Sequence, residues 1–113
     1  MKIVSWNYRG LGGNQKIEVI KTLKSMESNS ILLIHETKKT VEESLSTMKK
    51  NWTKGEGKAV NAIGASGGLL TWWDEDKFSM RSSIKNRNWL FVELEDKENK
   101  EVLWVGNIYG PTV

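Results

Sequence analysis

Glu36 is the first residue whose type and position suggest chemistry, because it follows an unbroken apolar run. Residues 31–34 read Ile-Leu-Leu-Ile, and His35 and Glu36 come directly after them. A short apolar run of this kind is typical of a strand buried on both faces. A carboxylate at the end of such a strand suits Mg²⁺, which prefers oxygen ligands and often takes only one or two protein carboxylates plus substrate phosphate. The alternative is that Glu36 simply begins a solvated loop.

His35 is the single histidine of the chain, and we do not expect it to work with Glu36 as a histidine–carboxylate pair. Successive side chains of a strand point to opposite faces, so His35 would face away from Glu36. The glycines of residues 10–15, Gly-Leu-Gly-Gly-Asn-Gln, do not complete a dinucleotide-binding motif, because Gln15 stands at its last position. No glycine precedes Lys-Ser or Lys-Thr as a P-loop requires, so the sequence predicts no nucleotide cofactor.

The composition limits the possible classes of protein. A chain of 113 residues is one domain, and 17 basic against 14 acidic residues give a net charge of +3, which mildly favours polyanionic partners. The chain has no cysteine, so it can form neither a disulfide nor a thiolate metal site. Its first residues contain no long apolar run, and we expect an intracellular protein, nuclear or cytoplasmic, without a membrane partner.

The first half of the chain predicts strands that alternate with helices. A strand is expected over Ile3–Trp6, before a glycine-containing loop. Apolar residues recur at helical spacing over residues 15–28, with Asn14 as the N-cap. The strand over Ile31–Ile34 should be central in its sheet, and Thr40 should cap a second helix over residues 41–50.

The second half predicts strands in succession. After a polar stretch that contains glycines, strands are expected within residues 67–73, 78–84, 89–95 and 102–108, and residues 96–100 should form the last hairpin turn. The fold class is therefore α/β, with helices packed on a largely antiparallel sheet. Gly67 and Gly68 should let the chain enter a strand with unusual backbone angles, or let another backbone approach closely. Trp72 and Trp73 should point to opposite faces, most simply as core residues, although an exposed indole could stack on a base.

Four segments, in order, resemble the endonuclease/exonuclease/phosphatase family. They are SWNYRGLGG (residues 5–13), LLIHETK (32–38), GASGGLL (64–70) and VGNIYGPT (105–112), and together they span nearly the whole chain. Each motif alone is weak, but four in order are specific at the level of the family. The residue patterns of these segments are most similar to those of the endonuclease domains of plant non-LTR retrotransposons. The family's fold is the DNase I-like four-layer α-β-β-α sandwich, built mostly of antiparallel strands.

The resemblance implies roles for three residues. Asn7 would contact the phosphate or support the site, Glu36 would bind the catalytic Mg²⁺ or Mn²⁺, and Tyr109 would contact the reacting phosphate. Alternatives remain open, since Asn7 could be a turn residue and Tyr109 a residue that only ends a strand. Arg9 could reach a DNA phosphate or remain solvated.

Two departures from the family pattern limit what the resemblance implies. His35 stands where the family usually has glutamine, and Tyr8 follows Asn7 where a smaller residue is usual. The family's Gly-Asp-x-Asn and Ser-Asp-His motifs would lie beyond Val113, so we expect residues 1–113 to be the N-terminal part of the domain. We also expect an apolar sheet face that lacks its partner sheet and promotes self-association.

The function implied by the resemblance is Mg²⁺-dependent hydrolysis of DNA phosphodiesters by a retroelement-derived domain that is incomplete here. The alternatives are an inactive remnant that binds nucleic acid weakly or not at all, and a phosphomonoesterase acting on inositol phosphates. In each active case Asn7, Glu36 and Tyr109 should lie within about 15 Å of one another, because one phosphate and one metal cannot bridge a wider gap.

Overall fold

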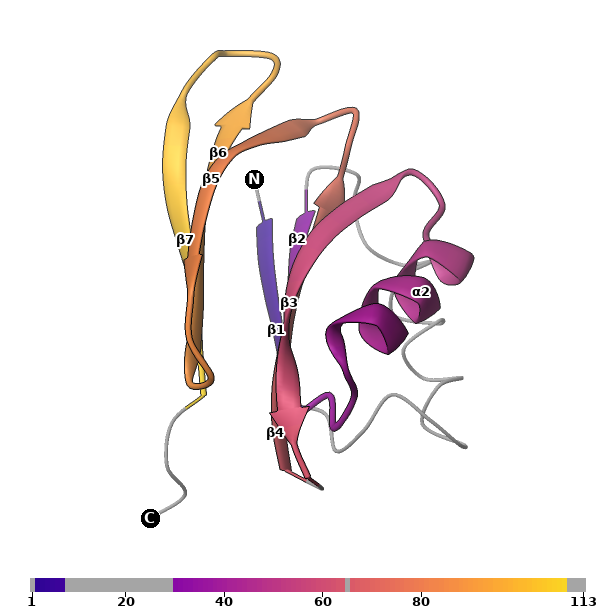
Figure 1. Ribbon diagram of the computed structural model, residues 1–113. Coiled ribbons are helices and arrows are strands. Elements are labelled where there is room, and N and C mark those ends of the chain that lie inside the picture. Colours follow the sequence, from indigo (N-terminus) through magenta and orange to yellow (C-terminus); the bar gives the residue numbers. More distant parts are fainter. Residues whose placement is uncertain (1, 8–29, 65, 110–113) are drawn as a thin grey trace.

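Seven strands and one helix make up the described part of the chain, which the computed structural model gives as residues 2–7, 30–64 and 66–109 (Figure 1). The helix expected over residues 15–28, its cap Asn14, and Arg9 lie outside these residues. The strands form two sheets, with the order β1-β2-β4-β3 in one and β5-β6-β7 in the other. Apart from the parallel pair β1–β2, all pairings are antiparallel, so the predicted α/β class with largely antiparallel strands is confirmed.

The first sheet is built around strand β2, Ser30–His35, which lies between β1 (Lys2–Asn7) and β4 (Ser66–Asp74). Its apolar run is buried on both faces, as the sequence predicts. Ile31 and Leu33 belong to the core between the sheets, whereas Leu32 and Ile34 belong to the core under the helix. Trp73 and Trp72 on β4 divide in the same way, and both are buried.

Strand β3, Gly55–Ile63, completes this sheet and was missed by the sequence analysis, which placed a polar connection there. Gly55 and Gly57 weaken any strand prediction because glycine is depleted in strands. The structure explains their presence, since a Cβ at either position would overlap the indole of Trp72 on the neighbouring strand. At Gly57 the Thr71 carbonyl oxygen also blocks a Cβ, so close packing against β4 accounts for both glycines of the edge strand.

Helix α2, Val41–Asn51, covers the outer face of the first sheet (Figure 1). It begins as predicted at Thr40, whose hydroxyl accepts from the backbone N–H of Glu43 at 3.1 Å while the Glu43 carboxylate accepts from the Thr40 N–H at 3.3 Å. Met48 points into the core and is fully buried. None of the described helical segments combines the length and apolarity that a membrane-crossing helix needs.

The second sheet packs against the face of the first sheet that is opposite the helix, so the described layers are helix, sheet and sheet (Figure 1). It contains β5 (Phe78–Lys85), β6 (Trp89–Asp96) and β7 (Val102–Ile108). Leu90, Val92 and Leu94 alternate along β6 as predicted and are fully buried between the sheets. The expectation that the first sheet would lack its partner sheet is therefore wrong, because β5–β7 supply one.

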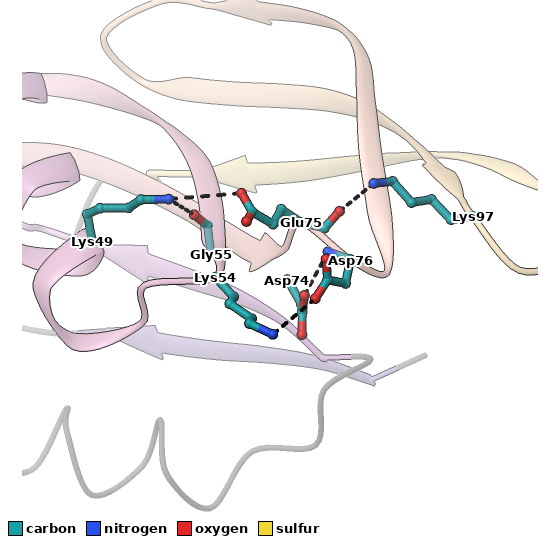
Figure 2. Close-up of polar contacts among 7 residues, drawn as sticks. All are labelled: Lys49, Lys54, Gly55, Asp74, Glu75, Asp76 and Lys97. Atoms are coloured by element: carbon teal, nitrogen blue, oxygen red, sulfur yellow. Dashed lines mark hydrogen bonds and ion pairs between the residues drawn. The ribbon is translucent and has the colours of Figure 1, made fainter.

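The chain passes from the first sheet to the second at a charged corner, residues 74–77 (Figure 2). Lys49 of α2 pairs with the Glu75 carboxylate at 3.9 Å, and Lys54 pairs with Asp76 at 3.8 Å. Lys97, from the turn between β6 and β7, donates to the Glu75 carbonyl at 2.6 Å. Exposed ion pairs of this kind contribute little each, so the corner orients the connection more than it stabilises the fold.

Candidate functional site

Glu36 and Tyr109 meet at one end of the two packed sheets. The Tyr109 hydroxyl donates to Glu36 Oε1 at 3.0 Å, although the residues are 73 positions apart in the sequence. Glu36 directly follows β2, and Tyr109 directly follows β7. Both side chains are half-buried. The expected convergence of these two residues is therefore present, with a direct hydrogen bond between them.

The backbone around Glu36 has an unusual shape that the sequence does not reveal. Glu36 and Lys38 both have φ of +56°, in the left-handed region that residues other than glycine seldom adopt. The amides of Thr37 and Lys38 donate to the carbonyls of Gly68 at 3.1 Å and Gly67 at 3.0 Å. These bonds tie the turn after β2 to the start of β4 and hold the Glu36 backbone in its conformation.

The predicted role of the two glycines agrees with their backbone angles. Gly67 has φ of +77° and Gly68 has φ of +89°, values that favour glycine. A Cβ at Gly68 would also overlap the hydroxyl of Thr37, which is fully buried, whereas a Cβ at Gly67 would meet open space. Gly68 is therefore required twice, for its conformation and for the close approach of the turn that carries Glu36.

Asn7 belongs to the same end of the first sheet. In the parallel pairing of β1 and β2 it is the register partner of His35, the residue before Glu36. The backbone of Asn7 therefore lies one strand spacing, about 5 Å, from that of His35. The register therefore places the Asn7 backbone beside the end of β2, and the convergence of its side chain with Glu36 and Tyr109 stays a prediction.

His35 faces a different partner from Glu36. Its Nε2 lies 3.4 Å from the Ser5 hydroxyl on β1, whereas Glu36 accepts from Tyr109. Burial lowers the pKa of His35, because it disfavours the charged imidazolium. The strand alternation invoked for this separation is not its cause, because β2 ends at His35 and Glu36 has a left-handed backbone.

The hydrogen bond to Glu36 favours the protonated form of Tyr109. Its pKa is raised, first because the hydroxyl donates to the Glu36 carboxylate, then because of the negative charge of that carboxylate and of burial. Tyr109 is therefore a proton-bearing donor throughout the neutral range. A phenol in this state can donate to an anionic oxygen without itself carrying charge.

A cleft of about 270 Å³ opens beside Tyr109, between the tip of the β3–β4 hairpin and the turn that joins β5 to β6. Polar groups dominate its lining, and Arg87 supplies a positive charge. In the sequence, Arg87 and Asn88 belong to a polar stretch that indicates only a turn, so no sequence pattern predicts a role for them. The cleft is lined by Asn61, Ile63, Ser66, Gly67, Gly68, Arg87, Asn88 and Tyr109.

The fit of the site to a metal ion depends on the oxygen atoms at Glu36. Within residues 2–7, 30–64 and 66–109, no three histidine, cysteine, aspartate or glutamate side chains form a cluster that could hold an ion. Mg²⁺, however, commonly keeps several waters and takes one or two carboxylates plus substrate phosphates. Glu36 therefore fits such an ion as a single protein carboxylate in a site completed by water and phosphate.

Comparison of the chain with protein-family models gives no match, and comparison with curated proteins gives no significant match. Membership of the endonuclease/exonuclease/phosphatase family therefore stays a prediction, carried by the four sequence segments.

Proposed function

We propose that this chain carries the metal-facing and phosphate-facing part of a divalent-metal-dependent phosphodiesterase that acts on DNA. The observation that carries the proposal is the 3.0 Å hydrogen bond between Tyr109 and Glu36, which joins two of the sequence segments that resemble the family. A carboxylate and a protonated phenol side by side suit a hard cation and a phosphate oxygen respectively. The retroelement origin is part of the proposal and rests on the residues of the motifs.

Each residue of the site has a proposed role. Glu36 holds Mg²⁺ or Mn²⁺, which when bound would supply Lewis-acid stabilisation of the charge that develops on the phosphate. Tyr109 donates its hydroxyl proton to a phosphate oxygen in place of Glu36 Oε1, and Asn7 supplies an amide to the same phosphate. Arg9 contacts the DNA backbone farther from the reacting phosphate.

The proposed fold is the DNase I-like sandwich. Two sheets packed face to face, with a helix on the outer side of one, are consistent with three of its four layers. None of the roles above supplies a general base for water, and the Nε2 atom of the single histidine, His35, lies 3.4 Å from the Ser5 hydroxyl, whereas Glu36 accepts from Tyr109. We therefore expect residues 1–113 alone to bind metal and phosphate without hydrolysing DNA.

Metal-dependent DNA binding tests this proposal. Fluorescence anisotropy of a labelled DNA duplex is measured with increasing Mg²⁺, and half-maximal binding is expected at roughly millimolar Mg²⁺ because one carboxylate leaves most ligand positions to water. Glu36→Gln should abolish the Mg²⁺-dependent part of binding. The matched control is Glu42→Gln, which removes the same charge from an exposed position of α2. Equal losses in the two variants would contradict the proposal.

Two further assays separate the alternatives. Supercoiled DNA should not be nicked by the chain in Mg²⁺, and nicking that disappears in Glu36→Ala would show that these residues already form a complete site. Release of inorganic phosphate from an inositol polyphosphate, lost in the same variant, would favour the phosphomonoesterase. An absence of both activities and of Mg²⁺-dependent DNA binding would identify an inactive remnant.

A further inference from the structure

Asn107 forms a polar bridge between the two sheets. It lies on β7 and is 1% exposed, and its Nδ2 donates across the gap to the Leu70 carbonyl on β4 at 2.9 Å. The same nitrogen approaches the Ile34 carbonyl on β2 at 3.4 Å and the Thr71 hydroxyl at 3.3 Å. One amide group therefore connects β7 to two strands of the opposite sheet.

The bridge lies close to the site in both sheets. Ile34 is two residues before Glu36, and Asn107 is two residues before Tyr109. Tyr109 packs against the same core between the sheets, and its backbone N–H donates to the Asn88 carbonyl at 2.7 Å. The bond to Asn88 holds Tyr109 within its own sheet, whereas Asn107 joins the two sheets from a fully buried position. Lys85 also crosses between the sheets, from β5 to the Ala59 carbonyl on β3 at 3.1 Å, but from a partly buried position.

Stability alone does not explain an asparagine at this position. The Oδ1 atom of Asn107 is buried without a hydrogen-bond partner in the described part of the structure, and a buried acceptor without a partner is unfavourable. The buried cluster around it between the sheets is apolar. A leucine would bury its side chain there without an unpaired acceptor, but apolar packing is non-directional and would not fix the spacing.

We infer that Asn107 is a positioning residue, whose bonds to the opposite sheet set the Tyr109 hydroxyl against Glu36. The purpose of this positioning, presentation of Tyr109 to a phosphate, rests on the proposed function. The positioning itself concerns only the Glu36–Tyr109 hydrogen bond, so it is measured without metal or DNA.

A double-mutant cycle tests the inference. Tyr109→Phe deletes the hydrogen bond to Glu36, and in the wild-type background it should raise the unfolding equilibrium constant about three- to tenfold. In the Asn107→Leu background the same substitution should change that constant less than twofold, because the hydroxyl is no longer held against Glu36. Val105→Ala is the matched control, since it also perturbs the buried side of β7 but leaves the amide bridge intact. In that background the effect of Tyr109→Phe should be undiminished.

A spectroscopic measurement separates positioning from a general structural role. The chain is labelled with 3-fluorotyrosine, and Tyr8→Phe removes the second of its two tyrosines. Glu36→Gln and Asn107→Leu should shift the fluorine resonance of Tyr109 in the same direction, whereas Val105→Ala should not shift it.

The results that overturn the inference are distinct from those that overturn the proposed function. Additive effects in the cycle, or an unchanged fluorine resonance in folded Asn107→Leu, would show that Asn107 does not position Tyr109. Asn107→Met serves as a second variant, and if neither variant folds, Asn107 is required for sheet packing as a whole and the inference fails. Coupling without Mg²⁺-dependent DNA binding would leave the inference standing and remove only the proposed function.

Discussion

The hydroxyl of Tyr109 is a hydrogen-bond donor of the site, and the structure identifies its acceptor. It donates to Glu36 at 3.0 Å from a half-buried position. The carboxylate stabilises the protonated phenol, so the pair acts as a donor and an acceptor held ready for a cation and an anionic oxygen. The chemistry of the pair therefore depends on two hydrogen-bond partners that come from opposite sheets.

Removal of the Glu36 charge should change the titration of Tyr109. We expect Glu36→Gln to lower the Tyr109 pKa toward its ordinary value of about 10, because the hydrogen bond to a carboxylate and its negative charge raise the pKa. The measurement is ultraviolet absorbance of phenolate formation in a Tyr8→Phe background with chelator present. An unchanged titration would contradict the hydrogen bond.

The same shift predicts how stability depends on pH. The pKa of Tyr109 is higher in the folded than in the unfolded state. Its contribution to the free energy of unfolding is therefore fully present below about pH 10 and is lost as the pH rises through the raised pKa. The free energy of unfolding of wild type should therefore approach that of Tyr109→Phe in strongly alkaline solution. A gap that stays constant across this range would argue against the assigned partner.

The turn after β2 and the start of β4 form the element that places Glu36. Two backbone hydrogen bonds join this turn to the start of β4, and four residues around them, Glu36, Lys38, Gly67 and Gly68, have φ between +56° and +89°. Such conformations cost free energy and persist only when neighbouring structure enforces them. The left-handed angle of Glu36 is thus an observed strain at the predicted metal ligand.

Gly68→Ala should be more destabilising than Gly67→Ala. Both positions force a left-handed backbone on alanine, at a cost of about 1–2 kcal/mol. At Gly68 the new methyl group would also overlap the Thr37 hydroxyl, whereas the space beside Gly67 is open. Urea denaturation measures the two losses, and Gly68→Ala should in addition weaken Mg²⁺-dependent DNA binding. Equal losses in the two variants would contradict the close approach at Gly68.

The elements differ in how far the sequence could predict them. The alternation of Leu90, Val92 and Leu94 is a local signal and gave β6, and Thr40 gave the start of α2. Strand β3 was not predicted because its glycines are explained by close packing against Trp72, which belongs to another strand. The bridge made by Asn107 and the backbone angle of Glu36 depend on contacts between the sheets or strands, which no local pattern contains.

At the scale of the whole molecule, the second sheet exposes several large apolar side chains on its outer face. Its residues alternate with the buried ones and are paired across the strands by the register of the sheet. Ile84 and Ile108 are each 56% exposed, and Trp104 is 51% exposed. The apolar residues of this face are Ile84, Trp89, Phe91, Val102, Trp104 and Ile108, and Ser79, Ser82, Glu93 and Glu95 lie on the same face. This face differs from the one expected from the sequence, which was the inner face of the first sheet and is covered by β5–β7.

This outer face should make the isolated chain self-associate, because exposed apolar area of this kind drives association. Ile84→Lys together with Trp104→Lys should lower the average mass measured by light scattering at high protein concentration. Ile63→Lys is the control, since Ile63 is as exposed as Ile84 but lies at the end of β3 beside the cleft. An equal effect of the control would mean that charge alone, rather than this face, governs association.

The most direct test of the proposed site is the location of a bound paramagnetic ion. Mn²⁺ is added in small amounts to the ¹⁵N-labelled chain, and the amide signals that broaden first are identified by NMR. We expect the first losses at Glu36, Thr37 and Tyr109, with the effect abolished in Glu36→Gln and kept in Glu42→Gln. Broadening centred on the acidic corner at Asp74, Glu75 and Asp76 (Figure 2), or unchanged by Glu36→Gln, would show that the ion binds elsewhere and that Glu36 is not its ligand.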